Sequence, residues 1–98
     1  MFAGFLPTKT QERLRVLADW KARAAEDLAL VFYEAPHRID AALGALAEVF
    51  GAEREVLIAR ELTKVFEQSV RLPLGETAAW LAADPNHARG EFVLVVYP

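Results

Sequence analysis

The sequence has no cysteine and a single serine, Ser69. Without cysteine there are no disulfides and no thiolate metal ligands, which is typical of a cytoplasmic protein. Ser69 falls inside an expected strand and has no nucleophile elbow around it, which argues against a serine hydrolase. The two histidines, His37 and His87, lie far apart in the sequence. We therefore expect no metal site.

Long apolar runs and clustered glycines are also missing. No apolar run approaches the ~20 residues that a membrane helix needs, and the N-terminus lacks the basic and apolar regions of a signal peptide. We therefore expect no membrane association. The five glycines stand singly, so there is no glycine-rich phosphate loop. The net charge is −3, so any contact with RNA needs a local basic patch or another part of a larger protein.

What is present is a hydrophobic fraction of 54% in 98 residues, enough for the core of one domain, residues 1–98. The apolar patterns predict the order β-α-β-α-β-β-α-β. The strands are expected at 2–6, 28–33, 55–60, 65–72 and 92–97, and the helices at 8–25, 37–51 and 76–83. Residues 61–64 are too few for a parallel crossover, so the strands on either side form an antiparallel hairpin. The fold class is therefore α/β, a mixed five-stranded sheet with helices packed on its faces.

The first expected helix has a capping signal at its start. Thr8 is the expected N-cap, with Gln11 reaching back to it. Leu14 and Leu17 form the expected buried side of this helix, together with Trp20. The basic residues of the helix, including Arg13, are expected to be mostly solvated.

The segment 28–39 organises the chain. Residues 28–33 form a continuous apolar run, which is typical of a strand covered on both faces. The run stops at Glu34, and an amphipathic helix follows that ends at Gly51, a normal C′ glycine. Pro36 suits the first turn of that helix, where its missing N–H is no loss. His37 and Arg38 share this turn with Glu34, and ligands of open α/β sheets bind outside the carboxyl ends of strands.

A second charged cluster follows the strand 55–60. It contains Arg60, Glu61, Thr63 and Lys64. If this strand and the strand 28–33 run in the same direction in one sheet, their polar ends share one edge. We expect this shared edge.

Each of these side chains has a functional and a structural interpretation. His37 can act as a general base or make a structural hydrogen bond in the first turn of its helix. Arg38 can bind phosphate through its planar guanidinium or form a surface ion pair. Glu34 follows a buried strand and needs a partner, most simply Arg38 or Arg60. The residues alone leave these alternatives open.

Three motifs in this order resemble a known family. They are Gly4–Pro7 with Lys9 and Arg13 beyond it, Phe32–Arg38 (Phe-Tyr-Glu-Ala-Pro-His-Arg), and Ala59–Lys64 (Ala-Arg-Glu-Leu-Thr-Lys) followed by Glu67. With the closing segment Gly90–Val96, they resemble the C-terminal half of ribosomal RNA small subunit methyltransferase I. That family belongs to the tetrapyrrole methylase (class III) superfamily.

The resemblance implies a two-domain, S-adenosylmethionine-dependent homodimer of the cytoplasm that methylates the ribose 2′-hydroxyl of a cytidine in 16S ribosomal RNA. Residues 1–98 would be its C-terminal domain. The main cofactor motif lies in the N-terminal domain, which is absent here, so the chain alone should be inactive. The candidate bases are Glu34, His37 and Lys64; the candidate RNA-binding residues are Arg38, Arg60, Glu61 and Thr63; the candidate cofactor contacts are Leu6, Ala35 and Val96.

Two other functions stay open. A corrin or porphyrin-precursor methylase has the same fold with another substrate, although the charged clusters resemble the ribosomal branch specifically. A non-catalytic dimerisation or RNA-docking module is the second alternative.

Overall fold

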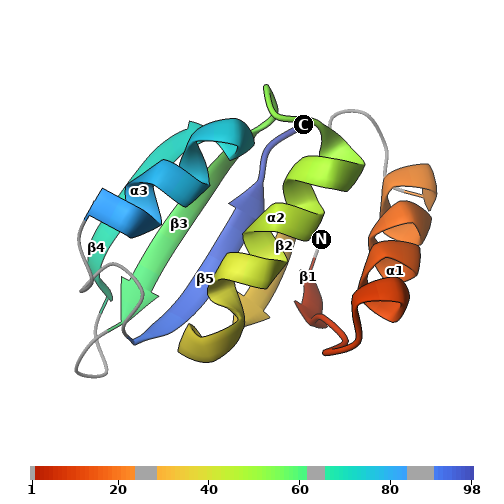
Figure 1. The fold of residues 1–98 in the computed structure, drawn as a ribbon, viewed down its shortest axis with the longest axis horizontal. Helices are drawn as coiled ribbons and strands as arrows, with labels where there is room; N and C mark the ends of the chain where they lie inside the picture. Colours follow the sequence, from red (N-terminus) through yellow and green to blue (C-terminus); the bar gives the residue numbers. More distant parts are fainter. Residues whose placement is uncertain (1, 24–28, 62–65, 84–89) are drawn as a thin grey trace.

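The computed structural model describes residues 2–23, 29–61, 66–83 and 90–98. The strands are β1 (Phe2–Phe5), β2 (Leu30–Glu34), β3 (Glu55–Glu61), β4 (Phe66–Pro73) and β5 (Glu91–Val96). The helices are α1 (Thr10–Arg23), α2 (Ile39–Phe50) and α3 (Thr77–Ala83); the 3₁₀ turns η1 (Pro36–Arg38) and η2 (Leu74–Glu76) lead into α2 and α3. The predicted order of strands and helices is confirmed (Figure 1).

The five strands form one mixed sheet in the order β1-β2-β5-β3-β4. β1 and β2 are parallel, β5 is antiparallel to both of its neighbours, and β3 and β4 form the predicted antiparallel hairpin. The last strand along the chain therefore lies at the centre of the sheet. In the hairpin, Arg60 pairs with Gln68 but Glu61 pairs with Phe66. One extra residue of β4, Glu67, therefore lies between these two pairs, as in a β-bulge.

Within the described residues, all the helices lie on one face of the sheet (Figure 1). Along β2, residues Leu30, Phe32 and Glu34 are buried, whereas Val31 and Tyr33 between them are partly or largely exposed. The expectation that this strand is covered on both faces is wrong. Its physical reason is that the β1-α1-β2 and β2-α2-β3 crossovers step across the sheet in the same direction, so that two right-handed connections lie on the same side.

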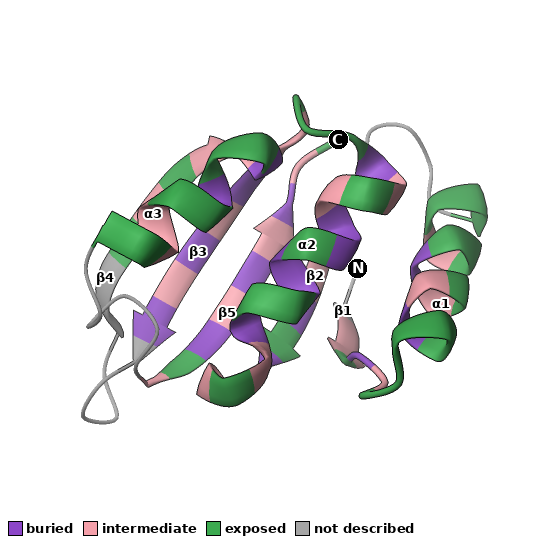
Figure 2. Cartoon of the chain, in the orientation of Figure 1, coloured by how far each residue is buried: buried purple, intermediate pink, exposed green. Residues whose placement is uncertain are grey.

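The uncovered face is nonetheless rich in apolar residues. It carries Val31, Tyr33, Leu57, Ala59, Val93 and Val95 from the three central strands. Figure 2 shows the resulting alternation of buried and intermediate residues along β3 and β5. A continuous apolar run in the sequence thus reflects a strand at the centre of the sheet, not burial on both of its faces.

The core lies between the helices and the covered face. α2 buries residues at helical spacing: Ile39, Ala42, Leu43, Leu46 and Phe50. They share one core with residues of the central strands that include Phe32, Ile58, Phe92 and Leu94. No helix within the described ranges is long and apolar enough to cross a membrane.

The ends of the first two helices explain how α1 is attached to α2. Gly51 ends α2 with a φ of 97°, and its N–H donates to the Ala47 carbonyl at 2.9 Å, as a C-terminal glycine should. The Nζ of Lys21, in α1, donates to the Val49 carbonyl near the same helix end at 2.9 Å. A cation at the last turn complements the helix dipole.

α1 begins at Thr10, two residues after the expected N-cap Thr8. The N–H of Arg13 donates to the Lys9 carbonyl at 2.9 Å, so Lys9 is the residue that precedes the first turn. Leu17 is fully buried, and Leu14 packs against the core as expected. The expected end of this helix, near residue 25, lies outside the described residues.

Candidate functional site

Three strands end on the same edge of the sheet. β1 is parallel to β2, and both β2 and β3 are antiparallel to β5, so all three run in one direction. Leu6–Thr8 follow β1, Glu34–Arg38 end β2 and its turn, and Arg60–Glu61 end β3. We call this the carboxyl edge. The prediction that the two charged clusters share one edge is confirmed for the described part of the second cluster, Arg60 and Glu61.

Glu34 and Arg60 flank one residue of the central strand. Both are register partners of Phe92, Glu34 from β2 and Arg60 from β3. Adjacent strands are about 4.8 Å apart, so the two backbones are separated by roughly 10 Å. Both side chains lie on the helix-covered face, where Glu34 is 1% exposed and Arg60 6% exposed. The helix-covered face of the sheet therefore carries two charged side chains, those of Glu34 and Arg60, at the carboxyl edge.

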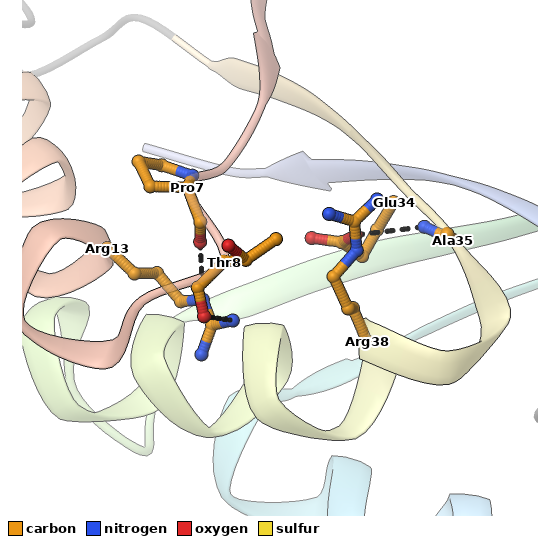
Figure 3. Close-up of polar contacts among 6 residues, drawn as sticks. All are labelled: Pro7, Thr8, Arg13, Glu34, Ala35 and Arg38. Carbon is orange, nitrogen blue, oxygen red and sulfur yellow. Dashed lines mark hydrogen bonds and ion pairs between the residues drawn. The ribbon is translucent and has the colours of Figure 1, made fainter.

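The Glu34 carboxylate is held by the turn that follows it (Figure 3). Its Oε1 accepts the N–H of Ala35 at 2.9 Å and lies 3.2 Å from Nε of Arg38. The turn is closed by the N–H of Arg38, which donates to the Ala35 carbonyl at 3.0 Å. Arg38 is thus an ion-pair partner of Glu34, one of the two that the sequence left open.

The two residues of η1 that carry chemistry are accessible. His37 is exposed, and within the described residues no hydrogen bond joins its ring to another group. The Arg38 side chain keeps 27% of its surface exposed in spite of its ion pair. The structural interpretation of His37, a hydrogen bond inside the first turn, therefore gains no support from the described part of the chain.

Arg13 is a site residue that the sequence interpretation missed. It was expected to be solvated, but it is only 5% exposed. Its Nε donates to the Pro7 carbonyl at 3.2 Å and its Nη2 to the Thr8 carbonyl at 3.0 Å (Figure 3). The spacing of four residues to the buried Leu17 places both on the inward face of α1 and was the signal available in the sequence. Arg13 fixes the loop after β1 at the carboxyl edge.

The candidate cofactor positions do not all come together. Leu6, 4% exposed, and Ala35, partly exposed, both lie at the carboxyl edge. Val96 pairs with Leu30 and with Val56, which are at or near the starts of β2 and β3, so it lies at the opposite edge. The reason is that β5 runs antiparallel to β2 and β3. The last residues of β5 therefore lie at the edge of the sheet where β2 and β3 begin.

Some of the candidate site residues are not among the residues that the structure describes. Thr63 and Lys64 lie outside the described residues, as does His87, and Glu61 is described only as the last residue of β3. Within the described ranges, no group of three acidic or histidine side chains is arranged to hold a metal ion. An open hollow of about 610 Å³ lies beside the first turn of α1, lined by Lys9, Thr10, Gln11, Glu12 and Arg15.

Known proteins resemble the chain over almost its whole length. It is 47% identical over 97 residues to ribosomal RNA small subunit methyltransferase I of Neisseria meningitidis serogroup B, covering 99% of this chain and 32% of the relative. The same-named protein of Vibrio cholerae is 45% identical over 96 residues, and that of Bacillus subtilis 41% over 95 residues. They are covered to 32% and 30% of their lengths, so the chain spans about a third of these relatives. No family model matches the chain.

The fold also has a counterpart among solved structures. The crystal structure of the methyltransferase CobJ aligns with a TM-score of 0.60 and 19% identity, covering 99% of this chain and 40% of that one. At this identity the likeness concerns the fold alone. The three motifs indicated a similarity to the ribosomal RNA small subunit methyltransferase I family. The curated relatives confirm this similarity along nearly all of the 98 residues of the chain.

Proposed function

We propose that this chain is the C-terminal domain of a two-domain, S-adenosylmethionine-dependent methyltransferase acting on the 2′-hydroxyl of a cytidine in 16S ribosomal RNA. One observation carries the proposal. The charged segments that resemble those of the ribosomal family meet at the carboxyl edge, with Glu34 and Arg60 on either side of Phe92. A strand-end cluster of this kind is where open α/β sheets bind ligands.

The proposed role of this edge is to bind the RNA substrate. Arg38 is partly exposed, and its planar guanidinium suits a phosphate group. We propose that Arg60, 6% exposed, acts on the RNA through its charge rather than through a direct contact, and that Glu61 and Thr63 are further RNA contacts. A local cluster of this kind is what a chain of net charge −3 needs for an RNA partner.

His37 is the favoured general base. Transfer of a methyl group from a sulfonium to a ribose oxygen needs a near-linear approach and removal of the hydroxyl proton. His37 is exposed at the carboxyl edge, whereas the Glu34 carboxylate is buried and bound to Arg38. Lys64, outside the described residues, is the alternative base that the assay below tests.

S-adenosylmethionine would supply the electrophilic methyl group. We propose that the N-terminal domain holds most of it and that this chain contributes apolar and backbone surface at Ala35. Ala35 is partly exposed at the carboxyl edge and can offer apolar and backbone surface to a cofactor, whereas Leu6 belongs to the buried core beside it. Val96 is left out, because it lies at the opposite edge. We further propose a cytoplasmic homodimer, in keeping with a ribosomal substrate.

The test is methyl transfer by the full-length protein. Labelled S-adenosylmethionine and unmethylated small ribosomal subunits are incubated with the enzyme, and the RNA is digested to nucleosides. We expect the label in 2′-O-methylcytidine. His37→Ala should lower the rate by about 10²–10⁴-fold, as loss of a general base does. Label on a base, or no transfer to RNA, would contradict the proposal; an inactive Lys64→Ala beside an active His37→Ala would assign the base to Lys64.

A corrin or porphyrin-precursor methylase is the second candidate. It stays open because it has the same fold with another substrate, but the named relatives at 41–47% identity are ribosomal RNA methyltransferases. The same assay with a tetrapyrrole precursor in place of ribosomal subunits separates the two substrates. Binding of subunits without any methyl transfer would instead favour the non-catalytic docking module.

A further inference from the structure

The Glu34 carboxylate is placed to hold another residue, not to touch a substrate. It is 1% exposed at the end of β2, and its Oε1 is already in contact with the N–H of Ala35 and with Nε of Arg38. Its Oε2 is buried and has no hydrogen-bond partner in the described part of the chain. A general base must come within hydrogen-bond reach of the proton that it removes. Glu34 meets that condition only if the turn around it rearranges.

Arg38 is held at one end of its guanidinium. Nε is buried and forms an ion pair with Glu34 Oε1 at 3.2 Å without the geometry of a hydrogen bond, and within the described residues no hydrogen bond joins Nη1 or Nη2 to another group. The side chain is 27% exposed although Nε is buried, so this outer end reaches solvent. The outer nitrogens carry four of the five N–H donors of the group in a planar fork, which matches two oxygens of one phosphate.

We propose that Glu34 is a positioning residue that fixes Arg38 so that its Nη groups receive a phosphodiester of the RNA substrate. The inference rests on the function proposed above. A flexible arginine loses side-chain freedom when it binds a ligand, and an arginine already fixed through Nε loses less. The i,i+4 spacing of the pair lets one rigid turn, closed from Arg38 to Ala35, set the distance between carboxylate and guanidinium.

A double-mutant cycle in the full-length protein tests the inference. The probe is the unmethylated small ribosomal subunit, and its dissociation constant is measured between about 50 and 200 mM salt. We expect Arg38→Ala to weaken binding roughly 10-fold or more and to lower the slope of log K against log salt by about 0.7–0.9, the contribution of one phosphate contact. Glu34→Ala should weaken binding in the presence of Arg38 and have no further effect in the Arg38→Ala background.

Two further variants keep the outcome clear. Arg71→Ala removes the same charge from an exposed side chain of β4, close to the opposite edge, and should leave the salt slope unchanged. If Glu34→Ala fails to fold, Glu34→Gln replaces it in both backgrounds, because it keeps an acceptor for the N–H of Ala35 while losing the charge.

The outcomes separate the inference from the proposed function. An unchanged affinity and slope in Arg38→Ala, or an equal loss from Glu34→Ala in both backgrounds, overturns the inference while wild-type methylation of RNA still stands. A wild-type protein that neither binds nor methylates the subunits overturns the proposed function and the inference together.

Discussion

Glu34 and Arg60 are joined through a single residue, since both pair in register with Phe92 from opposite sides of β5. This relationship makes one site out of two segments that are separate in the sequence. It depends on β5, because that strand is antiparallel to both β2 and β3 and so gives those two strands a common direction. The functional proposals above depend on this arrangement.

A comparison of three consecutive residues separates site from core. His37 is exposed, Arg38 is partly exposed, and Ile39 is 1% exposed at the start of α2. Ile39→Ala should lower the free energy of unfolding by roughly 2–5 kcal/mol, because it removes buried methyl groups. His37→Ala and Arg38→Ala should change stability much less but lower methyl transfer strongly.

Thermal melts and single-turnover methylation on the same three variants of the full-length protein decide the matter. If His37→Ala and Arg38→Ala melt early yet keep their activity when folded, the pair is structural and the functional interpretation of the turn is wrong.

Two glycines of α2 should respond to alanine with opposite signs. Gly51 has a φ of 97°, where an L-residue is strained, so Gly51→Ala should destabilise the protein by about 1–2 kcal/mol. Gly44 is exposed in the middle of the helix, so Gly44→Ala should stabilise it by about 0.5–1 kcal/mol. A Cβ at either position meets no atom within 4 Å. Urea unfolding of both variants measures the difference, and equal signs would show that backbone conformation does not control the effect.

Arg13 should be a stabilising residue. Arg13→Ala removes two hydrogen bonds to the Pro7 and Thr8 carbonyls and should cost about 2–3 kcal/mol of unfolding free energy. Arg15→Ala, an exposed position of the same helix, is the matched control and should stay within about 0.5 kcal/mol of wild type. Chemical denaturation of the two variants provides the comparison. Similar values for both would mean that the buried guanidinium contributes nothing to the fold.

The chain by itself should bind S-adenosylmethionine weakly. It spans about a third of its relatives, and a ligand of this size is normally buried by 70–90% in a complete pocket. Titration calorimetry with ligand up to about 1 mM should give no saturable heat with this chain, while the full-length protein binds. Micromolar affinity for the chain alone would mean that the main cofactor site lies in these residues.

Much of the fold followed from local patterns. The apolar runs identified the strands, the helical spacing from Ile39 to Phe50 identified α2, and Gly51 marked its end. The short connection after Glu61 required the hairpin, because too few residues separate β3 from β4 for a crossover. These features depend on interactions between residues that are close in the sequence, so local sequence patterns are enough to predict them.

What could not be predicted depends on long-range pairing. The apolar residues of β2 and β5 are those of central strands, but nothing local says whether a second layer covers their outer face. Val96, a candidate cofactor contact at a strand end, lies at the opposite edge from Leu6 and Ala35, because the direction of β5 relative to β2 is a property of the whole sheet. The expectation that Arg13 is solvated depends on its residue type alone, although its spacing of four residues to Leu17 already indicates the inward face of α1.

The position of β5 also has a consequence for the order of folding. The last strand in the chain joins β2 to β3, so before it arrives the sheet consists of two unconnected parts, β1-β2 and β3-β4. Each part leaves an open edge of backbone N–H and C=O groups, the kind of surface through which chains associate. On the ribosome, where synthesis proceeds from the N-terminus, the two halves must wait for residues 91–96 before the sheet can close. Truncation of those six residues should therefore produce an aggregating chain rather than a smaller folded domain.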